Sequence, residues 1–316
     1  MNFGTQIDYL KQVAFFFIML PVKIGLQLSV SPYTWGFELT PFLITAYFII
    51  MMLFASWCFL KFSKDVAIGI ILFSIFIYFG LTNMPWLPLI LIYGLIGFKI
   101  GGLKLSITIV ASFLFITFTG VLPQALLSIY LCGIAVIISF ILGSSLGIWA
   151  AHNDKVSAFM RPINDTMQTM PSFVILIPFV MFFGIGEFTA LLAIIAYAFV
   201  PAMRYTEHGL RNLPETVIEA ARMIGCSQTQ LLWKVKIPLA MPVIMLGLNQ
   251  TIMFGLAMLV IAALVGTTGL GQLIYIGLSK ADFGTGMISG VSIALIAIIF
   301  DRTTQAWRIK LEKKTQ

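Results

Sequence analysis

Long apolar runs make up most of the chain, and short polar or basic segments separate them. The runs lie near residues 41–60, 66–83, 86–98, 104–120, 124–150, 169–185, 188–206, 241–265 and 285–307. Most approach the roughly 20 residues that cross a bilayer as a helix. A segment in lipid must satisfy its own backbone hydrogen bonds, and these runs lack the alternation of a strand, so they predict helices. The pattern therefore predicts an all-α polytopic membrane protein with about 8–9 transmembrane helices.

The first apolar stretch, residues 13–30, differs from the others because Pro21 and Lys23 interrupt it. This interruption favours an interfacial helix over a span. Residues 1–40 are therefore interpreted as an N-terminal interfacial segment, and residues 41–85 as extra N-terminal membrane helices.

The number of spans depends on two of the runs. If residues 66–83 cross the membrane, the chain has nine spans and its N-terminus lies outside; if they lie along the surface, it has eight and the N-terminus lies inside. The run at 86–98 is short for a crossing and depends on its flanks.

Composition supports the membrane assignment. Only 10% of the residues are charged and the mean hydropathy is +1.03, whereas about a quarter of the residues of a soluble domain are charged. The three cysteines (Cys58, Cys132 and Cys226) and the two histidines (His152 and His208) are far apart and have no metal-ligand spacing. The N-terminus also lacks the pattern of a cleaved signal peptide.

The basic residues set the orientation. If the polar loop at 207–240 is cytoplasmic, sixteen of the 19 Lys and Arg residues lie on the inner side, and only Lys11, Lys23 and Lys280 lie outside. This bias follows the positive-inside rule and places the C-terminus, with a short tail at 309–316, in the cytoplasm. It also explains the net charge of +7 without a nucleic-acid partner.

The loop at 207–240 is longer and more charged than a helix connection requires. Pro214 predicts the start of a helix, Gly225 a sharp turn, and Ser227 the N-cap of a second short helix that Pro238 ends. The second helix is expected to expose an apolar knob formed by Leu231, Leu232 and Trp233. Such a knob indicates either a partner surface or a pair of helices lying on the bilayer.

The loop resembles the EAA motif of bacterial ATP-binding-cassette (ABC) importer permeases. Glu219, Ala220 and Ala221 are followed after three residues by Gly225, and after nine more by an aliphatic–x–aliphatic–proline ending at Pro238. The ending departs from the usual pattern only by Val235 and Ile237, where isoleucine and leucine are usual. In this family the loop is the coupling helix, so the resemblance implies ATPase-coupling roles for Glu219, Ala220, Ala221, Gly225, Gln228, Leu231, Leu232 and Pro238.

Four further segments resemble the permease of glycine betaine and proline importers: "MQTMPSFVILIPFVMFFGIG", "MPVIMLGLNQTIM", "GLGQLIYIGLSKADFG" and "IIFDRTTQA". The resemblance covers roughly residues 86–308, the expected permease domain, and the first 85 residues match poorly. It implies a type I ABC importer permease fold in a bacterial plasma (inner) membrane.

The same resemblance implies the partners. Two ATPase subunits would bind ATP and Mg²⁺, an extracytoplasmic binding protein would deliver the substrate, and a second, identical permease would complete the pathway. Betaines, choline, proline and trimethylamine N-oxide all fit as substrates. The chain has no G-x-x-x-x-G-K-[ST] loop and no catalytic carboxylate pair, so it is expected to be a transport subunit without catalytic residues, cofactor or metal.

Polar residues beside or within spans are candidates for the translocation pathway: Gln168, Thr169, Ser172, Asn249 and Thr251. Hydrogen bonding between helices is the alternative role. Glu187, Gly269 and Gly271 are candidates for a periplasmic gate or a binding-protein contact; the alternatives are a solvated loop charge and a tight turn.

Two other functions compete with the ABC permease. A stand-alone secondary transporter of a small osmolyte would need intramembrane charges, and only Asp301 and Arg302 are strong candidates; both lie where snorkelling explains them. A membrane scaffold that recruits a cytosolic protein through the loop at 207–240 is the third possibility.

Overall fold

The computed structural model describes residues 11–22, 45, 49 and 86–315, and every element in these ranges is helical. The elements after residue 85 are α5 (Trp86–Phe118), α6 (Leu122–His152), α7 (Asp154–Thr169), α8 (Ser172–Phe183), α9 (Glu187–Arg211), α10 (Glu215–Met223), α11 (Gln228–Gln230), η2 (Leu231–Lys236), α12 (Ile237–Ala262), η3 (Ala263–Val265), α13 (Leu270–Ser279) and α14 (Phe283–Thr315). The predicted spans near 41–60 and 66–83 fall almost wholly outside the described residues.

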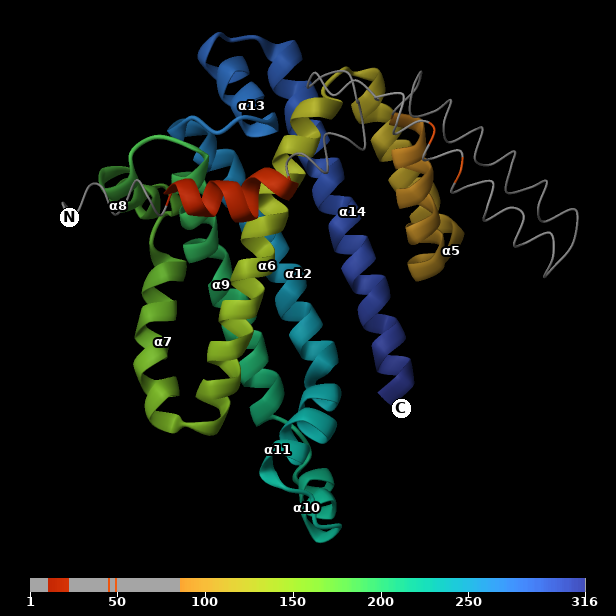
Figure 1. Cartoon of the computed structure of the whole chain (residues 1–316), viewed down its shortest axis with the longest axis vertical. Helices are drawn as coiled ribbons and strands as arrows, with labels where there is room; N and C mark the ends of the chain where they lie inside the picture. The colour runs from red at the N-terminus through yellow and green to blue at the C-terminus, as the bar shows by residue number, and fades with distance from the viewer. Residues whose placement is uncertain (1–10, 23–44, 46–48, 50–85, 316) are drawn as a thin grey trace, which may run out of the picture.

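Four long helices, α6, α9, α12 and α14, run side by side and form the body of the molecule (Figure 1). By length and composition alone, five helical stretches in the described ranges could cross a membrane: Leu122–His152, Glu187–Arg211, Gln228–Val265, Phe283–Glu312 and Leu89–Phe118, the last of which is interrupted at Gly102. The bent pair α7 and α8 makes a sixth if it is counted as one broken span. The predicted all-α polytopic fold is confirmed.

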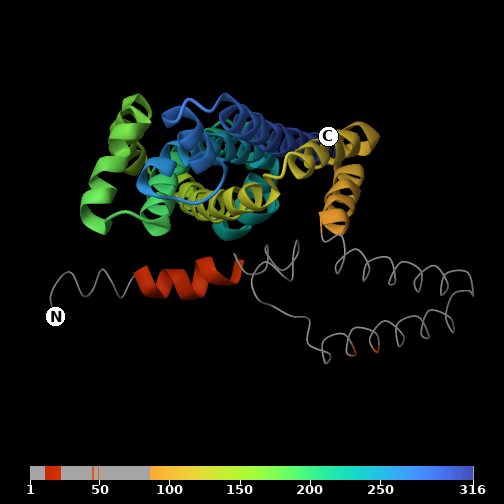
Figure 2. The same cartoon turned by 90° about the horizontal axis from the view of Figure 1, so that it is seen from above.

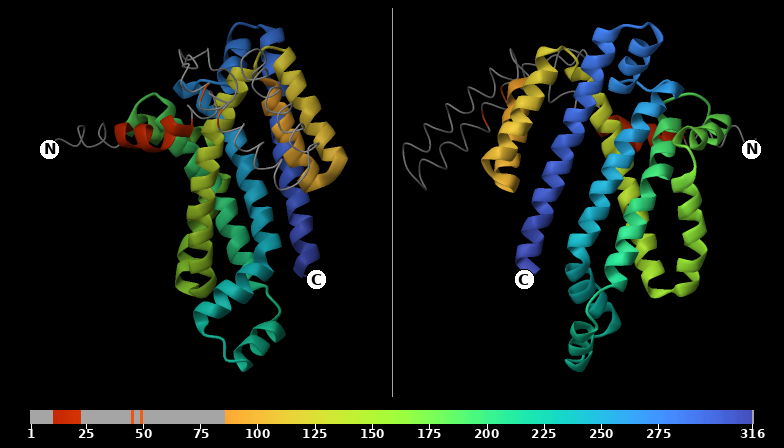
Figure 3. Two further views of the ribbon diagram at one scale, coloured as in Figure 1. Left: turned by 45° about the vertical axis from the view of Figure 1, so that its right-hand side comes forward. Right: turned by 180° about the vertical axis from the view of Figure 1, so that it is seen from behind.

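The two ends of the bundle differ. At one end α10 and α11 project beyond the long helices, and the turn between α6 and α7 and the C-terminal end of α14 lie on the same side (Figures 1 and 3). At the opposite end α13 and the loop before it cover the bundle (Figure 1). The structure therefore separates the charged loop at 207–240 from the glycine-rich loop at 266–269.

Close packing of α6 on α9 depends on two glycines one helical turn apart. A Cβ atom on Gly143 would lie 2.5 Å from the carbonyl oxygen of Phe199, and one on Gly147 would lie 2.6 Å from that of Met203. Small residues at this four-residue spacing let two membrane helices approach backbone to backbone. The sequence contains this G-x-x-x-G pair, but the pattern of apolar runs does not indicate it.

The helix α5 is a hairpin rather than one straight span. At Gly102 the backbone adopts φ 74° and ψ −166°, and the chain reverses direction there. Ser106 Oγ donates a hydrogen bond of 2.9 Å to the carbonyl oxygen of Gly94, and the rings of Tyr93 and Phe113 stack at 5.3 Å. Each arm contains about 16 residues, or ~24 Å of helix, which is short of the ~30 Å hydrocarbon core. The predicted runs at 86–98 and 104–120 are the two arms, and both are short.

The predicted single span at 169–185 is wrong. Helix α7 already begins at Asp154, and the chain bends by 102° between α7 and α8. Pro171 causes the break because it has no N–H for the preceding turn and it forces Met170 into an extended conformation, here φ −69° and ψ 130°. Thr169 and Ser172 therefore lie on either side of a break instead of at the start of a span.

The N-terminal helix Lys11–Val22 lies across the long helices, outside the bundle (Figures 1 and 2). Met19 is buried against the hydrophobic core, whereas Phe17 and Ile18 are exposed. A short helix crossing the bundle axis has the geometry expected of the described part of the predicted interfacial segment.

Candidate functional site: the projecting loop, the cleft and the Glu187 cross-link

The projecting loop is a helix–turn–helix, as the sequence predicts. Pro214 precedes the first helix, α10, and the side chain of Ser227 caps the second. The Ser227 hydroxyl accepts a hydrogen bond from the backbone N–H of Gln230 at 3.3 Å, while the Gln230 side chain accepts one from the Ser227 N–H at 3.0 Å. This reciprocal capping box fixes where the second helix begins.

Gly225 makes the turn between the two helices. Its φ is 88°, in the left-handed region that glycine adopts without cost. The N–H of Gly225 bonds the carbonyl oxygen of Arg222 at 2.9 Å, and the N–H of Cys226 bonds that of Ala221 at 3.2 Å. These bonds satisfy carbonyls at the end of α10 and set the angle at which the second helix leaves it.

The second helix does not end at Pro238, which corrects the prediction. It continues through the wide turns of η2 into α12, so that residues 228–265 form one helical segment. A π-helical segment immediately before the proline accommodates its missing N–H without stopping the helix. The loop is consequently attached to α12 through continuous helix.

The exposed apolar residues of the loop are also not the three that were predicted. Leu231 is only 1% exposed and Leu232 is half-buried, whereas Trp233 is 63% exposed. The most exposed large apolar side chains of the loop are Met223 at 89% and Ile224 at 84%, at the end of α10. We call Met223 and Ile224 the α10 corner. In the sequence, the α10 corner is marked by two apolar residues immediately before Gly225.

The other predicted coupling residues divide between surface and interior. Ala221 is buried, while the remaining ones are exposed: Glu219, Ala220, Gly225, Gln228 and Pro238. Helix α10 packs against η2, and Ala221 is its buried residue, whereas the exposed residues leave one face of the loop open.

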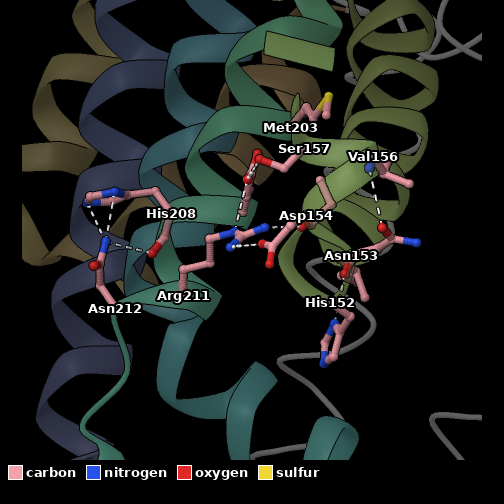
Figure 4. A network of polar contacts seen from close by, with 12 residues as sticks. His152, Asn153, Asp154, Val156, Ser157, Met203, His208, Arg211 and Asn212 are labelled. Carbon is pink, nitrogen blue, oxygen red and sulfur yellow. Dashed lines mark hydrogen bonds and ion pairs between the residues drawn. The ribbon is translucent and has the colours of Figure 1, made fainter. Parts of the chain in front are cut away.

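A polar network fixes the base of this loop to the turn between α6 and α7 (Figure 4). The Arg211 guanidinium pairs with Asp154 at 2.7 Å and Glu207 at 3.0 Å, and donates to the carbonyl oxygen of Ala150 at 2.6 Å. Ser157 donates to the same Glu207 carboxylate at 2.5 Å. Because Arg211 is the last residue of α9, these contacts join three helices at the point where the loop leaves the bundle.

A cleft of about 690 Å³ lies between α7, α9 and α12 near this network. Its wall is polar along α7 and α9, where Arg204 forms an ion pair with Asp165 across the cleft. On α12 it is lined by Gln250 and Phe254, one helical turn apart.

The structure does not bring the five predicted pathway residues together. Gln168 lines the cleft, whereas Thr169 bonds its own helix at the carbonyl oxygen of Asp165 (2.9 Å). Asn249 faces α14, and Thr251 is buried and bonds the carbonyl oxygen of Gly247 at 2.9 Å. Ser172 lies at the start of α8.

Asn249 is part of an interhelical polar cluster between α12 and α14. The side-chain Nδ2 of Asn249 donates to Asp301 at 2.9 Å, and its side-chain Oδ1 accepts from the Thr304 hydroxyl at 2.7 Å. Gln305 also donates to Asp301, at 2.7 Å. Asp301 thus contacts the neighbouring helix, and the expectation that it snorkels is wrong.

At the opposite end of the bundle, Glu187 cross-links three segments. Its carboxylate accepts hydrogen bonds from the Tyr130 hydroxyl of α6 at 2.7 Å and from Thr268 of the glycine-rich loop at 2.9 Å. Beside it, Gly269 has φ 127°, and a Cβ there would lie 2.6 Å from Ser128 Oγ. The same hydroxyl accepts a hydrogen bond from the N–H of Leu270 at 2.8 Å.

The glycine-rich loop is therefore packed directly on α6. Gly271 also has little room, because a Cβ on it would lie 3.1 Å from the carbonyl oxygen of Leu259. Glu187 is half-buried and hydrogen-bonded rather than a solvated loop charge.

These features define a multi-pass helical membrane protein of the permease class. Residues 143–308 match the family described as binding-protein-dependent transport system inner membrane component, and the chain belongs to this family. The family match, which covers both the G-x-x-x-G pair and the projecting loop, agrees with the resemblance found in the sequence.

Two of the curated relatives are named as glycine betaine permeases. The chain is 40% identical over 226 residues to the glycine betaine/proline betaine transport system permease protein ProW of Escherichia coli, which covers 72% of this chain and 64% of ProW. It thus spans less than two thirds of that relative. It is 36% identical over 266 residues to the glycine betaine transport system permease protein OpuAB of Bacillus subtilis, covering 83% of this chain and 94% of OpuAB.

A solved structure shares the fold. The inward-facing MetNI methionine ABC transporter matches with a TM-score of 0.54 and 18% sequence identity, over 60% of this chain and 95% of that chain. This likeness shows that the two chains share a fold.

Proposed function

We propose that the chain is the membrane-spanning permease subunit of an ATP-driven importer for a compatible solute of the glycine betaine type. The observation that carries the proposal is the projecting loop: a capped helix–turn–helix, joined to α12 by continuous helix, with the exposed α10 corner. The family match and the names of both relatives support the same function.

The loop is the surface on which a separate ATPase subunit docks. The EAA-type spacing from Glu219 through Gly225 to Pro238 lies within it, and the α10 corner offers the apolar contact. The sequence has no phosphate-binding G-x-x-x-x-G-K-[ST] loop, so ATP and Mg²⁺ belong to the ATPase. The loop and the C-terminus share one end of the bundle, and the basic residues assign that end to the cytoplasm (Figure 3).

The cleft between α7, α9 and α12 forms the cytoplasmic part of the passage. It combines an aromatic ring at Phe254, amides at Gln168 and Gln250 and charges of both signs, which suit a zwitterion that carries a quaternary ammonium and a carboxylate. The cross-link at Glu187 closes the opposite end. High-affinity binding resides in an extracytoplasmic binding protein, and two copies of the permease complete the pathway.

Reconstitution tests the proposal. The chain is assembled in liposomes with its ATPase, and uptake of labelled glycine betaine is measured with the binding protein added to the substrate side. Uptake is expected only with ATP and binding protein together. Uptake by the chain alone, driven by an ion gradient, would instead establish a secondary transporter and overturn the proposal.

A further inference from the structure

A second groove, of about 530 Å³, lies on the outer surface of the bundle between the α5 hairpin and α14. The hairpin lies beside α14 at the edge of the bundle (Figures 1 and 2). A Cβ atom on Gly101, next to the hairpin turn, would lie 3.2 Å from the Cβ of Ala306, so the two elements meet closely at this point. The groove is separate from the cleft between α7, α9 and α12 and shares no lining residue with it.

The groove lies at the inner boundary of the membrane. The apolar part of α14 runs from residue 283 to residue 300, which is ~27 Å of helix and close to the ~30 Å hydrocarbon core. Asp301 and Arg302 follow at once, and Trp307 is half exposed one to two turns later, as at a membrane interface. Arg302 lines the groove at this boundary, and Ile298 lines it one turn deeper.

Two cations that line the groove have no side-chain partner in the part of the chain that the structure describes. Among the described residues, neither Lys104 of α5 nor Arg302 of α14 makes a side-chain hydrogen bond or an ion pair. The nearest acid in the sequence, Asp301, already accepts hydrogen bonds from Asn249 and Gln305.

Other cations nearby increase the positive charge. The ammonium group of Lys310 contacts the carbonyl oxygen of Lys99 across the same two elements. The carboxylate of Glu312 pairs within its helix with Arg308 at 3.6 Å. Four basic side chains therefore surround the hairpin turn: Lys99, Lys104, Arg302 and Lys310.

We propose that this groove binds an anionic phospholipid of the inner leaflet. The lipid phosphate lies between Lys104 and Arg302, and an acyl chain follows Ile298, whose side chain is 43% exposed, toward the membrane interior. Basic pockets between membrane helices on the cytoplasmic side are suited to anionic headgroups, because the phosphate pairs with cations while the chains stay in hydrocarbon. The bound lipid contacts both the α5 hairpin and α14 beside the point where Gly101 and Ala306 meet.

Native mass spectrometry of the purified full chain tests this site. The protein is titrated in detergent with phosphatidylglycerol or with phosphatidylcholine, and the fraction carrying lipid is measured. The double variant K104Q/R302Q is compared with K155Q/K280Q, which removes two exposed lysines elsewhere. For two cations near the phosphate, we expect K104Q/R302Q to weaken phosphatidylglycerol binding by about 30-fold, and the control variant to bind as wild type.

Two further experiments, a charge-retaining variant and a competition with inorganic phosphate, test the same site. The single variant Arg302→Lys retains the charge and is expected to keep most of the binding, even if the double variant folds poorly. Inorganic phosphate at ~10 mM is expected not to displace the lipid, because the acyl chain contributes to binding. Equal retention of both lipids, equal weakening by the control variant, or full displacement by inorganic phosphate would each overturn the proposal.

Discussion

The hydroxyl of Tyr130 donates a 2.7 Å hydrogen bond to the carboxylate of Glu187, and this bond ties α6 to the start of α9 at the end of the bundle opposite the projecting loop. Thr268 reaches the same carboxylate from the glycine-rich loop. One acidic side chain thus holds three segments that must separate if this end of the molecule opens.

We expect Tyr130→Phe to lower the free energy of unfolding by about 1.5 kcal/mol, between the ~0.6 kcal/mol average for hydrogen bonds among membrane helices and the ~3 kcal/mol upper value for bonds to charged groups. Chemical unfolding of the purified protein measures it. Tyr275→Phe is the matched control, because Tyr275 is half exposed and makes no side-chain hydrogen bond among the described residues. A double-mutant cycle with Glu187→Gln should show coupling; strictly additive effects would refute the cross-link.

Gly143→Ala tests the close approach of α6 and α9. The added Cβ would lie 2.5 Å from a backbone oxygen that cannot move without displacing α9, so overpacking should cost about 1–3 kcal/mol. Thermal unfolding monitored by size exclusion should show a clearly lower midpoint. Gly133→Ala on the same helix is the control, since a Cβ there meets nothing within 4 Å. If both variants are equally stable, the glycine contact does not determine helix spacing.

Gly225→Val tests the turn in the projecting loop. A Cβ at Gly225 meets no atom within 4 Å, so any effect comes from its φ of 88°, which costs most residues about 1 kcal/mol or more. In the assembled complex, solute-stimulated ATP hydrolysis should fall sharply, while solute binding to the soluble binding protein is unchanged. Gly225→Asn should retain most of the hydrolysis because asparagine tolerates this conformation. If the valine variant shows normal solute-stimulated ATP hydrolysis, the turn at Gly225 has no role in coupling.

Ile224→Asp tests the α10 corner as the ATPase contact. A carboxylate forced into an apolar groove loses its hydration, so co-purification of the ATPase should fall at least about tenfold. Thr229→Asp places the same charge on an exposed polar position of the loop and should have little effect. Leu231→Asp should instead destabilise the protein itself, because this side chain is buried. Unchanged co-purification with Ile224→Asp would place the contact elsewhere.

Single-cysteine variants test the orientation. In a cysteine-free background, Gln228→Cys should resist an impermeant thiol reagent in intact cells and react in inverted vesicles. Lys280→Cys, at the opposite end of the bundle, should show the reverse pattern. Labelling of Gln228→Cys from outside would show that the orientation predicted for the chain after residue 86 is wrong.

Local sequence signals determined the projecting loop. Pro214, Gly225 and Ser227 each act through the backbone of their own or adjacent residues, so the helix start, the turn and the second cap follow from the sequence alone. The all-α membrane fold also follows from it, because apolar length and the need for internal hydrogen bonds in lipid leave little alternative.

Tertiary structure decided which neighbour each helical face meets. Helix α12 is apolar on nearly all sides, so its sequence does not indicate which face meets which neighbour. Only the packing shows that Gln250 and Phe254 face the cleft while Asn249 faces Asp301. The same holds for Leu231, which looked exposed in sequence but is covered by the neighbouring helices.

For the breaks in the helices, too, the sequence indicates the position and the tertiary structure decides the geometry. The sequence contained Gly102 and Pro171, but a glycine or proline marks only where a helix can bend. Whether the chain reverses, as at Gly102, or turns by 102°, as between α7 and α8, depends on the contacts available on either side. Those contacts come from residues distant in the sequence, and only the assembled bundle supplies them.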